Sequence, residues 1–343
     1  MVDSTGRAGL PWLVADVGGT NARFGWVSDP ARGVEHIHQL PVAGHAGPAD
    51  AVRAYLALLP AGARPCRAAI AVATAVRDDV VELTNSHWRF SRRGLQRELG
   101  LDSLQVLNDF EALALSLPRL KPQQLRPHGA PPAADGTLAV IGPGTGLGVG
   151  GVIPTAQGWV ALPGEGGHAT LAAADDHEAA LLAYARTRHA HVSAERLLSG
   201  IGLPLLHEAV AAVAGTPAEV LTAEQVVERG LAGDALCGLA LDSFCALLGG
   251  FAGNVALTLG ARGGVYIGGG IVPRLGERFF ASRFRERFEA KGRFREYLCA
   301  IPTALITDTQ AALAGAAFAI EQSASCAVPQ RTGPWTGRNG DEP

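Results

Sequence analysis

The sequence predicts an α/β fold built as two lobes with a cleft between them. Its 343 residues exceed what one compact core usually organises, so two units of ordinary domain size are expected. Short apolar runs bounded by glycine alternate with segments of helical period, a mixture typical of α/β proteins. Hydrophobic residues make up 48% of the chain and charged residues 18%, which favours extensive buried surface over disorder.

The predicted strands are short apolar runs that end at glycine or at turn residues. They are Trp12–Ala15, Ala68–Ala73, Leu104–Leu107, Leu138–Ile141 and Gly264–Ile267. The predicted helices show helical periodicity between these runs. They are Asp50–Leu59, Arg92–Leu99, Ala209–Val213, Arg274–Phe288 and Thr309–Ile320. After Ser323 the sequence becomes polar and rich in proline and glycine, so residues 323–343 are expected to form a flexible tail.

Charge and composition argue against nucleic-acid and membrane partners. The formal net charge is −3 and no run of basic residues occurs, so neither nucleic acid nor a membrane surface is an expected partner. The apolar stretch Leu239–Leu259 approaches membrane-spanning length. It contains Asp242, Asn254 and several glycines, which indicates a buried helix of the larger lobe instead.

Cysteine usage indicates a reducing compartment. The five cysteines are odd in number and show no metal-ligand spacing, so neither a disulfide framework nor structural zinc is expected. No charged-then-apolar leader precedes Leu13, and a cytoplasmic location is therefore expected. The cysteines are Cys66, Cys237, Cys245, Cys299 and Cys326.

Two segments of the chain repeat one pattern, and both are suited to hold phosphate. Trp12–Val27 and Leu138–Ile153 each read as an apolar strand, a glycine–threonine turn and a second apolar strand. Glycine permits positive φ and close approach of the backbone to an anion, while threonine hydroxyls and backbone N–H groups donate to phosphate oxygens. Either hairpin alone is equally typical of an ordinary tight turn. Together they suggest two related lobes that face one polyphosphate.

Two other phosphate-binding patterns do not fit. The only lysines are Lys121 and Lys291, and neither closes a glycine-rich turn, so a GxxxxGK(S/T) loop is absent. Residues 146–151 match GxGxxG, but a strand-like segment follows them where a dinucleotide fingerprint requires a helix. A third glycine-rich element, Gly263–Arg274, reads as a strand, a flexible turn and a helix start. Its glycines would let adenine lie against the backbone, whereas the alternative is a strand-to-helix connection without a ligand.

These segments, with two others, carry a resemblance to a known family. The chain resembles bacterial glucokinases of the actin-like sugar kinase superfamily from about Leu13 to about Ile320, through five motifs in order. The motifs are DVGGTNAR (16–23), GPGTGLG (142–148), LPGEGGH (162–168), SAERLLSG (193–200) and GGVYIGGGIVPR (263–274). The resemblance implies a duplicated, ribonuclease H-like fold with a small α/β lobe of residues 1–110 plus 305–322, a large α+β lobe of residues 111–304, and an interlobe cleft. It also implies a homodimer.

The resemblance implies that ATP lies between the two hairpins and against the third glycine-rich segment. The nucleotide-binding positions carried over are Asp16, Gly18, Gly19, Thr20, Asn21, Gly144, Thr145, Gly268, Gly269 and Gly270. Asp16 is also the expected Mg²⁺ partner, because a divalent ion is needed at the phosphates when no phosphate-loop lysine exists. The alternative for Asp16 is a residue that stabilises the turn with its own side chain.

The resemblance also implies a glucose site, and phosphoryl transfer to a sugar hydroxyl requires a base. The sugar-binding positions carried over are Asn108, Asp109, Glu165, His168 and Glu195. Asp109 directly follows an apolar strand and is the expected general base for the primary hydroxyl. The alternatives are a helix N-cap for Asp109, a turn carboxylate for Glu165, a core histidine for His168, and a solvated carboxylate paired with Arg196 or His191 for Glu195.

Two segments depart from the family pattern, and two other functions stay open. Residues 73–79 replace the usual turn before LTN (83–85), and residues 311–315 replace a proline- and glycine-containing helix start. A kinase for fructose or mannose of the repressor/kinase type is disfavoured because its cysteine-rich zinc motif is missing. A non-catalytic sugar sensor is disfavoured because about a dozen residues before the first strand cannot form a helix-turn-helix.

Overall fold

The computed structural model describes residues 9–130 and 136–325. Within them one sheet has five strands in the order β3-β2-β1-β4-β7, hereafter the first sheet. β4 and β7 run parallel to β1, and β2 runs antiparallel to both neighbours, β1 and β3. The bounds are β1 Trp12–Val17, β2 Asn21–Val27, β3 Glu35–Pro41, β4 Arg67–Val72 and β7 Ser103–Asn108.

A second sheet has six strands in the order β11-β10-β9-β12-β13-β8. β9 pairs antiparallel with β10 and parallel with β12. The bounds are β8 Leu125–Pro127, β9 Leu138–Pro143, β10 Leu147–Thr155, β11 Gly158–Leu162, β12 Gly264–Ile267 and β13 Thr303–Ile306. A small sheet pairs β5 (Val80–Glu82) with β6 (Arg89–Ser91).

The internal repeat seen in the sequence extends to whole sheets. In each sheet two strands form a hairpin, and the next strand of the chain pairs with the second hairpin strand. Two later parallel strands lie beside the first hairpin strand. Only β8, at the edge of the second sheet, has no counterpart in the first sheet. The series β1, β2, β3, β4, β7 therefore corresponds to β9, β10, β11, β12, β13. The two glycine–threonine turns occupy equivalent positions, since each connects the first two strands of its sheet.

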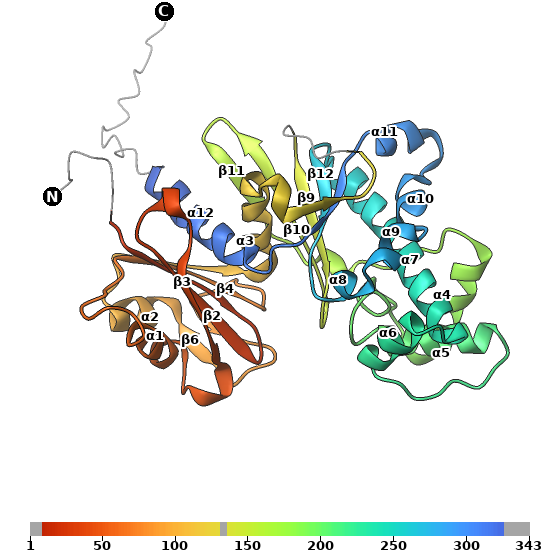
Figure 1. The fold of residues 1–343 in the computed structure, drawn as a ribbon, viewed down its shortest axis with the longest axis horizontal. Helices are drawn as coiled ribbons and strands as arrows, with labels where there is room; N and C mark the ends of the chain where they lie inside the picture. Colours follow the sequence, from red (N-terminus) through yellow and green to blue (C-terminus); the bar gives the residue numbers. More distant parts are fainter. Residues whose placement is uncertain (1–8, 131–135, 326–343) are drawn as a thin grey trace, which may run out of the picture.

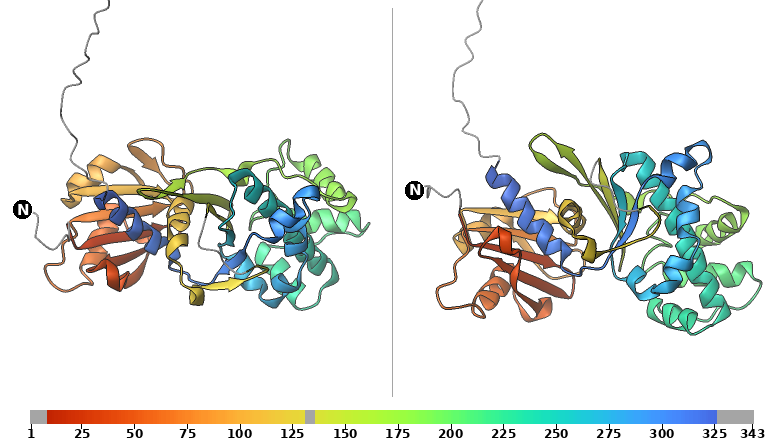
Figure 2. Two further views of the ribbon diagram at one scale, coloured as in Figure 1. Left: turned by 90° about the horizontal axis from the view of Figure 1, so that it is seen from above. Right: turned by 45° about the horizontal axis from the view of Figure 1, so that its top comes forward.

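The helices that follow the last equivalent strands exchange places. α3 (Asp109–Ser116) leaves the first sheet at β7 and packs on β9, β10 and β11 of the second sheet. α12 (Ala311–Ser325) leaves the second sheet at β13 and packs on β1 and β4 of the first sheet. The two helices lie side by side between the sheets (Figures 1 and 2). We call the first sheet with α1, α2 and α12 the small lobe, and the second sheet with α3–α11 the large lobe.

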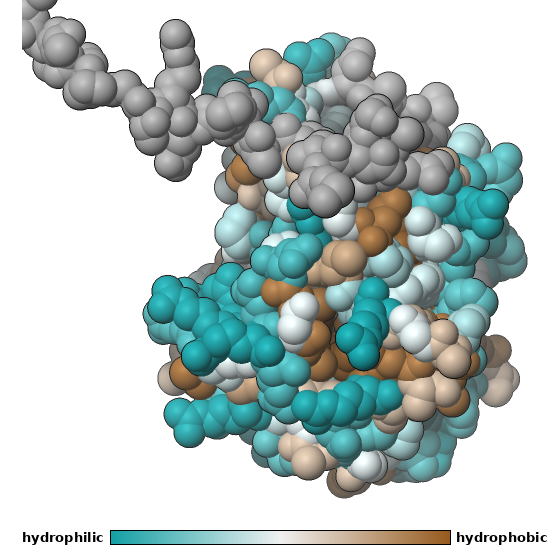
Figure 3. All heavy atoms as spheres, turned by 90° about the vertical axis from the view of Figure 1, so that its left-hand side faces the viewer, coloured by the Kyte–Doolittle hydropathy of each residue, from teal (hydrophilic) through white to brown (hydrophobic). Residues whose placement is uncertain are grey.

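Two apolar layers cover the first sheet. Leu13, Ala15 and Val17 point to the face that α1 (Pro48–Leu56) and α2 (Arg92–Leu99) cover. Alternate residues Trp12 and Val14 point to the α12 face, as a strand requires. The outer end of this lobe carries mostly hydrophilic side chains around a smaller apolar area (Figure 3).

The large lobe has its core around α7 (Ala235–Leu259). α7 is long and apolar enough to cross a membrane, and in the described residues it is the one helix that passes this test, but 72% of its apolar window is buried in the protein. The expectation of a buried helix in the larger lobe agrees with this packing. The surrounding helices are α4 Asp176–Arg188, α5 Leu203–Val213, α6 Ala223–Leu231, α8 Ile271–Leu275, α9 Glu277–Ala281, α10 Phe284–Glu289 and α11 Arg295–Cys299.

Two expectations from the sequence need correction. The single helix expected over 274–288 is three short helices, because Gly276 adopts φ 54° and Ser282 is extended, so both interrupt the helical backbone. The flexible tail expected over residues 323–343 is wrong for residues 323–325, because α12 continues to Ser325; residues 326–343, with Cys326, lie outside the described part of the chain. The four described cysteines are free. The residue limits of the two lobes stay a prediction.

Candidate active site

The first bend, Gly18–Thr20, connects β1 to β2. The Gly18 N–H donates to the Asn21 carbonyl at 2.9 Å, which closes the turn. Neither glycine has positive φ, so the left-handed backbone proposed for this turn is not the reason for its glycines. At Gly19 the reason is space, since a Cβ would lie 2.7 Å from the carbonyl oxygen of Asn85. Thr20 and Asn21 are exposed at the turn.

The second bend, Gly142–Gly148, connects β9 to β10 and is held by the SAERLLSG segment. The Gly200 N–H donates to the Gly144 carbonyl at 2.7 Å, and the Ile201 N–H donates to the Thr145 carbonyl at 3.3 Å. Thr145 is exposed, and a Cβ at Gly144 would meet no atom within 4 Å. The bend therefore presents an exposed hydroxyl and an accessible backbone.

The third glycine-rich segment, Gly268–Gly270, lies against the second bend. The Gly268 N–H donates to the Ile141 carbonyl at 2.8 Å. Gly269 adopts φ +76°, and a Cβ there would overlap the Pro143 carbonyl. This position therefore requires glycine both for its backbone conformation and for lack of space. Gly270 is exposed and has open space around it. Segments more than a hundred residues apart in the sequence thus form one glycine-lined surface.

Asp109 begins α3 at the end of β7, and Asn108 caps the helix. The Asn108 Oδ1 accepts from the Phe110 N–H at 2.9 Å and the Glu111 N–H at 3.3 Å, while its Nδ2 donates to the Thr74 carbonyl at 3.2 Å. The N-cap alternative raised for Asp109 is therefore wrong, because Asn108 takes that position. Asp109 is the first helical residue, and one of its oxygens accepts from the Phe110 N–H at 2.9 Å.

Asp16 and Glu165 both act electrostatically on Asp109 at the start of α3. Burial, together with the charges of Asp16 and Glu165, raises the pKa of Asp109 to about 6, although the backbone N–H groups of Phe110 and Asp109 lower it. Burial also raises the pKa of Asp16, while the Arg23 guanidinium opposes that shift. Asp16 lies near the carboxyl end of β1 and Asp109 directly follows β7, both in the first sheet, whereas Glu165 comes from the large lobe. The cluster thus lies where the two lobes face each other.

Glu195 and His168 lie beside the second bend. The Leu147 N–H donates to Glu195 Oε2 at 2.9 Å, and Glu195 Oε1 lies 4.0 Å from His168 Nδ1. The Glu195 side chain is 21% exposed, so the solvated surface carboxylate considered for it is wrong. His168 is exposed and not a core histidine, and His191 contacts Thr170 instead of Glu195.

Three residues at this site were not singled out from the sequence. Thr74, in the segment that departs from the family pattern, accepts a hydrogen bond from the Asn108 amide. Asn85 packs on Gly19, and the ring of Phe110 lies against Gly142 and Gly148. Phe110 directly follows the candidate catalytic residue Asp109 in the sequence, and that position was the available signal. Thr74 and Asn85 lie in the segments compared with the family pattern above, residues 73–79 and LTN (83–85), and that position was the signal for them.

The described residues contain no group of three or more His, Cys, Asp and Glu side chains able to hold a metal ion. Asp16 nevertheless offers a half-buried carboxylate close to Asp109, and carboxylate oxygen is a donor that Mg²⁺ accepts. Mg²⁺ commonly takes one or two carboxylates, with waters and substrate phosphates as its other ligands. The residues present fit such an ion only together with a bound nucleotide.

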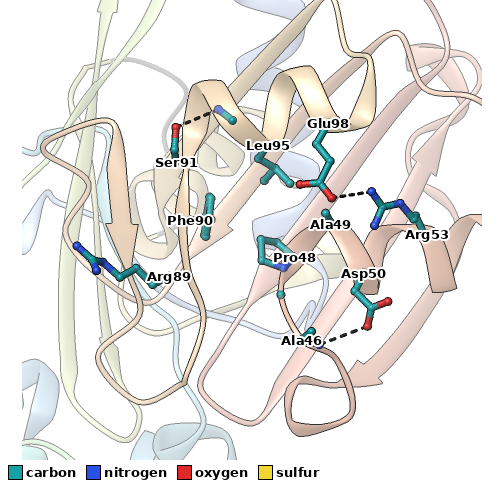
Figure 4. Close-up of a pocket in the computed structure, with 12 residues that line it drawn as sticks. Ala46, Pro48, Ala49, Asp50, Arg53, Arg89, Phe90, Ser91, Leu95 and Glu98 are labelled. Carbon is teal, nitrogen blue, oxygen red and sulfur yellow. Dashed lines mark hydrogen bonds and ion pairs between the residues drawn. The ribbon is translucent and has the colours of Figure 1, made fainter.

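A separate surface pocket of about 500 Å³ lies in the small lobe between α1, β6 and α2. None of the candidate residues lines it. Several of its polar groups are already paired, with Arg53 on Glu98, Asp50 on the Ala46 N–H and Ser91 on the Gly94 N–H (Figure 4). We therefore do not assign the chemistry to this pocket.

Comparisons with known proteins agree with the fold and the motifs. The glucokinase family profile matches residues 13–323. A glucokinase from Chromobacterium violaceum is 52% identical over 309 residues, which cover 90% of this chain and 88% of that protein. The crystal structure of a glucokinase from an Antarctic psychrotroph has a TM-score of 0.85 and 40% identity, covering 91% of this chain and 98% of that one.

A more distant structure shares the fold alone. The ROK family glucokinase from Streptomyces griseus, solved in complex with glucose and AMPPNP, has a TM-score of 0.62 and 20% identity, covering 90% of this chain and 98% of that one. The actin-like sugar kinase fold expected from the motifs is thus confirmed. The family profile spans nearly all described residues, and about half of the aligned residues are identical to those of the Chromobacterium violaceum glucokinase. The chain therefore belongs to the glucokinase family.

Proposed function

We propose that this enzyme transfers the γ-phosphoryl group of ATP to the primary hydroxyl of glucose, with Asp109 as the general base. The observation that carries the proposal is the position of Asp109: it is half-buried at the start of α3, and the charges of Asp16 and Glu165 both act on its carboxylate. A base with a pKa of about 6 is largely ionised at neutral pH and still accepts a proton readily.

The proposed reaction divides its parts between the two lobes. The first and second bends hold the phosphates through backbone N–H groups and the hydroxyls of Thr20 and Thr145, and the Gly268–Gly270 segment lies against adenosine. The glucose hydroxyls bind Glu165, His168, Glu195 and Asn108. The primary hydroxyl oxygen attacks the γ-phosphorus, the bond to ADP breaks, and the hydroxyl proton passes to Asp109.

Mg²⁺ fits this proposal through Asp16. The ion would neutralise charge on the β- and γ-phosphates, which no lysine of a phosphate loop does in this chain. Asp16 would hold it directly or through water. Of the sugar-binding set, Asn108 has the least freedom, because its Oδ1 caps α3 and its Nδ2 already donates to Thr74. One amide hydrogen of Asn108 remains to reach the sugar.

A coupled assay for ADP release tests the proposal with glucose, fructose, mannose and N-acetylglucosamine, each with and without Mg²⁺. We expect the highest kcat/KM with glucose and Mg²⁺. A higher value for another hexose would contradict the substrate, and turnover without any divalent ion would contradict the role of Asp16. By the same family resemblance we propose a homodimer in the cytoplasm, and light scattering tests the dimer.

A further inference from the structure

The glycines of the second bend serve a contact that the phosphate proposal does not use. Gly142 and Gly148 are direct cross-strand partners on β9 and β10. A Cβ at Gly148 would overlap three ring atoms of Phe110, and a Cβ at Gly142 would overlap two. The pair therefore forms a flat slot that the phenyl ring fills, and we call it the Phe110 slot.

The slot continues along the strand beneath α3. Gly150 lies two residues beyond Gly148 on the same face, and a Cβ there would lie 2.7 Å from the Phe110 carbonyl oxygen. A Cβ at Gly150 would also lie 3.3 Å from the Ala114 Cβ. Because this contact involves backbone, rotation of the phenyl ring alone would not relieve it. The first turn of α3 thus lies closely on the glycines of β10, where α3 contacts the second sheet (Figure 1).

Phe110 also holds the carboxylate of Asp109. Its backbone N–H donates to Asp109 Oδ1 and to Asn108 Oδ1, each at 2.9 Å. One residue therefore contacts the second bend through its ring and the proposed base through its amide. The distance between the base and the bend that is proposed to hold phosphate depends on how deeply the ring enters the slot.

We propose that Phe110 is a positioning residue, which sets the reacting geometry of Asp109 by occupying the slot between Gly142 and Gly148. The inference rests on the proposed function of Asp109 and of the second bend. A displacement of about 1 Å between reacting groups costs on the order of a hundredfold in rate. Loss of the contact should therefore lower kcat by a larger factor than it raises the KM for glucose, because Glu165, His168 and Glu195 stay in place and only Asn108 moves with the start of α3.

A double-mutant cycle tests the steric fit. Gly148→Ala should lower kcat by on the order of a hundredfold, since its methyl group displaces the ring. Phe110→Ala should also lower kcat. In the double variant the methyl group meets empty space, so Gly148→Ala should cost nothing further once Phe110 is alanine. Gly151→Ala on the same strand is the matched control, because its Cβ would meet Leu138 and Leu259 and not Phe110. Its cost should be equal in both backgrounds.

Each other result overturns the inference. If the factors by which Gly148→Ala and Phe110→Ala lower kcat multiply in the double variant, the two substitutions act independently. If each single variant has a near wild-type kcat, the Phe110 slot does not affect the rate. Melting temperatures identify an unfolded variant, for which Phe110→Leu replaces Phe110→Ala. The two proposals can fail separately. If Asp109→Asn is inactive while the effects of Gly148→Ala and Phe110→Ala on kcat multiply, the role of the Phe110 slot is refuted and Asp109 remains the proposed base.

Discussion

Asp109 carries the chemical argument at the scale of single residues. Burial and the charges of two other carboxylates raise its pKa and backbone N–H groups, that of Phe110 first, lower it, so these opposing effects leave the pKa at about 6. An exposed aspartate would be a weaker base at neutral pH because its pKa is lower. The surroundings of the residue, and not its type, therefore suit it to proton transfer.

The pH dependence of turnover follows from this pKa. Below about pH 6 Asp109 becomes protonated and accepts no proton, so kcat/KM for glucose should fall tenfold per pH unit on the acid side. Asp109→Asn should lower kcat by a factor on the order of a hundred to ten thousand at pH 7.5. Asp102→Asn, at the opposite end of β7, is the matched control and should retain wild-type rates. A rate profile that stays flat down to pH 5 would contradict the assignment.

The same carboxylate should cost stability. Its pKa in the folded protein lies above the ordinary 3.8, so ionisation opposes folding, and the cost grows as pH rises from about 4 to about 6. Asp109→Asn should therefore have a free energy of unfolding higher than that of the wild type by up to about 3 kcal/mol at pH 7.5. Its melting temperature should be higher accordingly. The difference should shrink towards pH 4. Scanning calorimetry across this range measures it, and a variant less stable at every pH would refute the argument.

The sequence identified candidate residues better than it explained them. Asn108 and Asp109 were expected as neighbours at a strand end, which β7 and α3 confirm. Which of the two caps the helix depended on side-chain rotamers that no spacing encodes. The glycines of the first bend were expected for their φ angles, but Gly19 is required by contact with Asn85, 66 positions away in the chain. Such contacts exist only after folding.

At the scale of elements, α3 and α12 determine how the two sheets meet. They cross at Gly315, where a Cβ would overlap the Ala112 carbonyl and lie 3.0 Å from the Ser116 nitrogen. Gly315 belongs to the alanine-rich segment that departs from the family pattern. The segment still begins a helix, whose small side chains allow the close approach.

Substitution at this crossing has a defined expected cost. Gly315→Ala should destabilise the protein by about 1–3 kcal/mol, because backbone atoms of α3 must move to admit the methyl group. Gly250→Ala in α7 is the control. Its Cβ would meet nothing within 4 Å, so it should stabilise by about 0.5–1 kcal/mol through helix propensity. Urea denaturation measures both, and equal effects of the two substitutions would contradict the steric argument.

Elements with strong local signals were predicted well and others were not. The strand Gly264–Ile267 and the helix Arg92–Leu99 have the predicted bounds. The helix has Ser91 at its N-cap and Gly100 in the left-handed conformation at its end, both local signals. The edge strand β3 was missed because its residues are mostly exposed and show no apolar run. Helical periodicity over 274–288 concealed two breaks, since neighbouring short helices share a buried face.

At the scale of the whole molecule, the lobes are joined by α3 and by the Thr307–Gln310 segment before α12. The Thr307 N–H donates to the Gln124 carbonyl in the large lobe at 2.9 Å, and Arg23 of the small lobe donates to the Thr309 carbonyl at 2.6 Å. Two adjacent parts of one short segment are therefore held by opposite lobes. A rotation between the lobes would be absorbed largely between these two contacts.

Glucose should close the lobes, because its proposed ligands come from both. Asn108 ends the small-lobe strand β7, whereas Glu165 and Glu195 lie in the large lobe. Small-angle scattering should show a smaller radius of gyration with saturating glucose than without sugar. L-glucose, the mirror image, is the control and should leave the radius unchanged. An identical radius with and without D-glucose would contradict closure.

The exchange of α3 and α12 has a consequence for biosynthesis. The first sheet leaves the ribosome early, but the helix that covers its Trp12 and Val14 face is encoded some three hundred residues later. That apolar face stays uncovered until almost the complete chain has been synthesised, so the nascent small lobe cannot finish folding by itself. We predict that a chain stopped at residue 304 binds a hydrophobic dye and is retained by chaperones, while the same chain extended to residue 325 does neither. If the chain stopped at residue 304 binds neither the dye nor chaperones, the first sheet folds without being covered by α12, which would contradict this prediction.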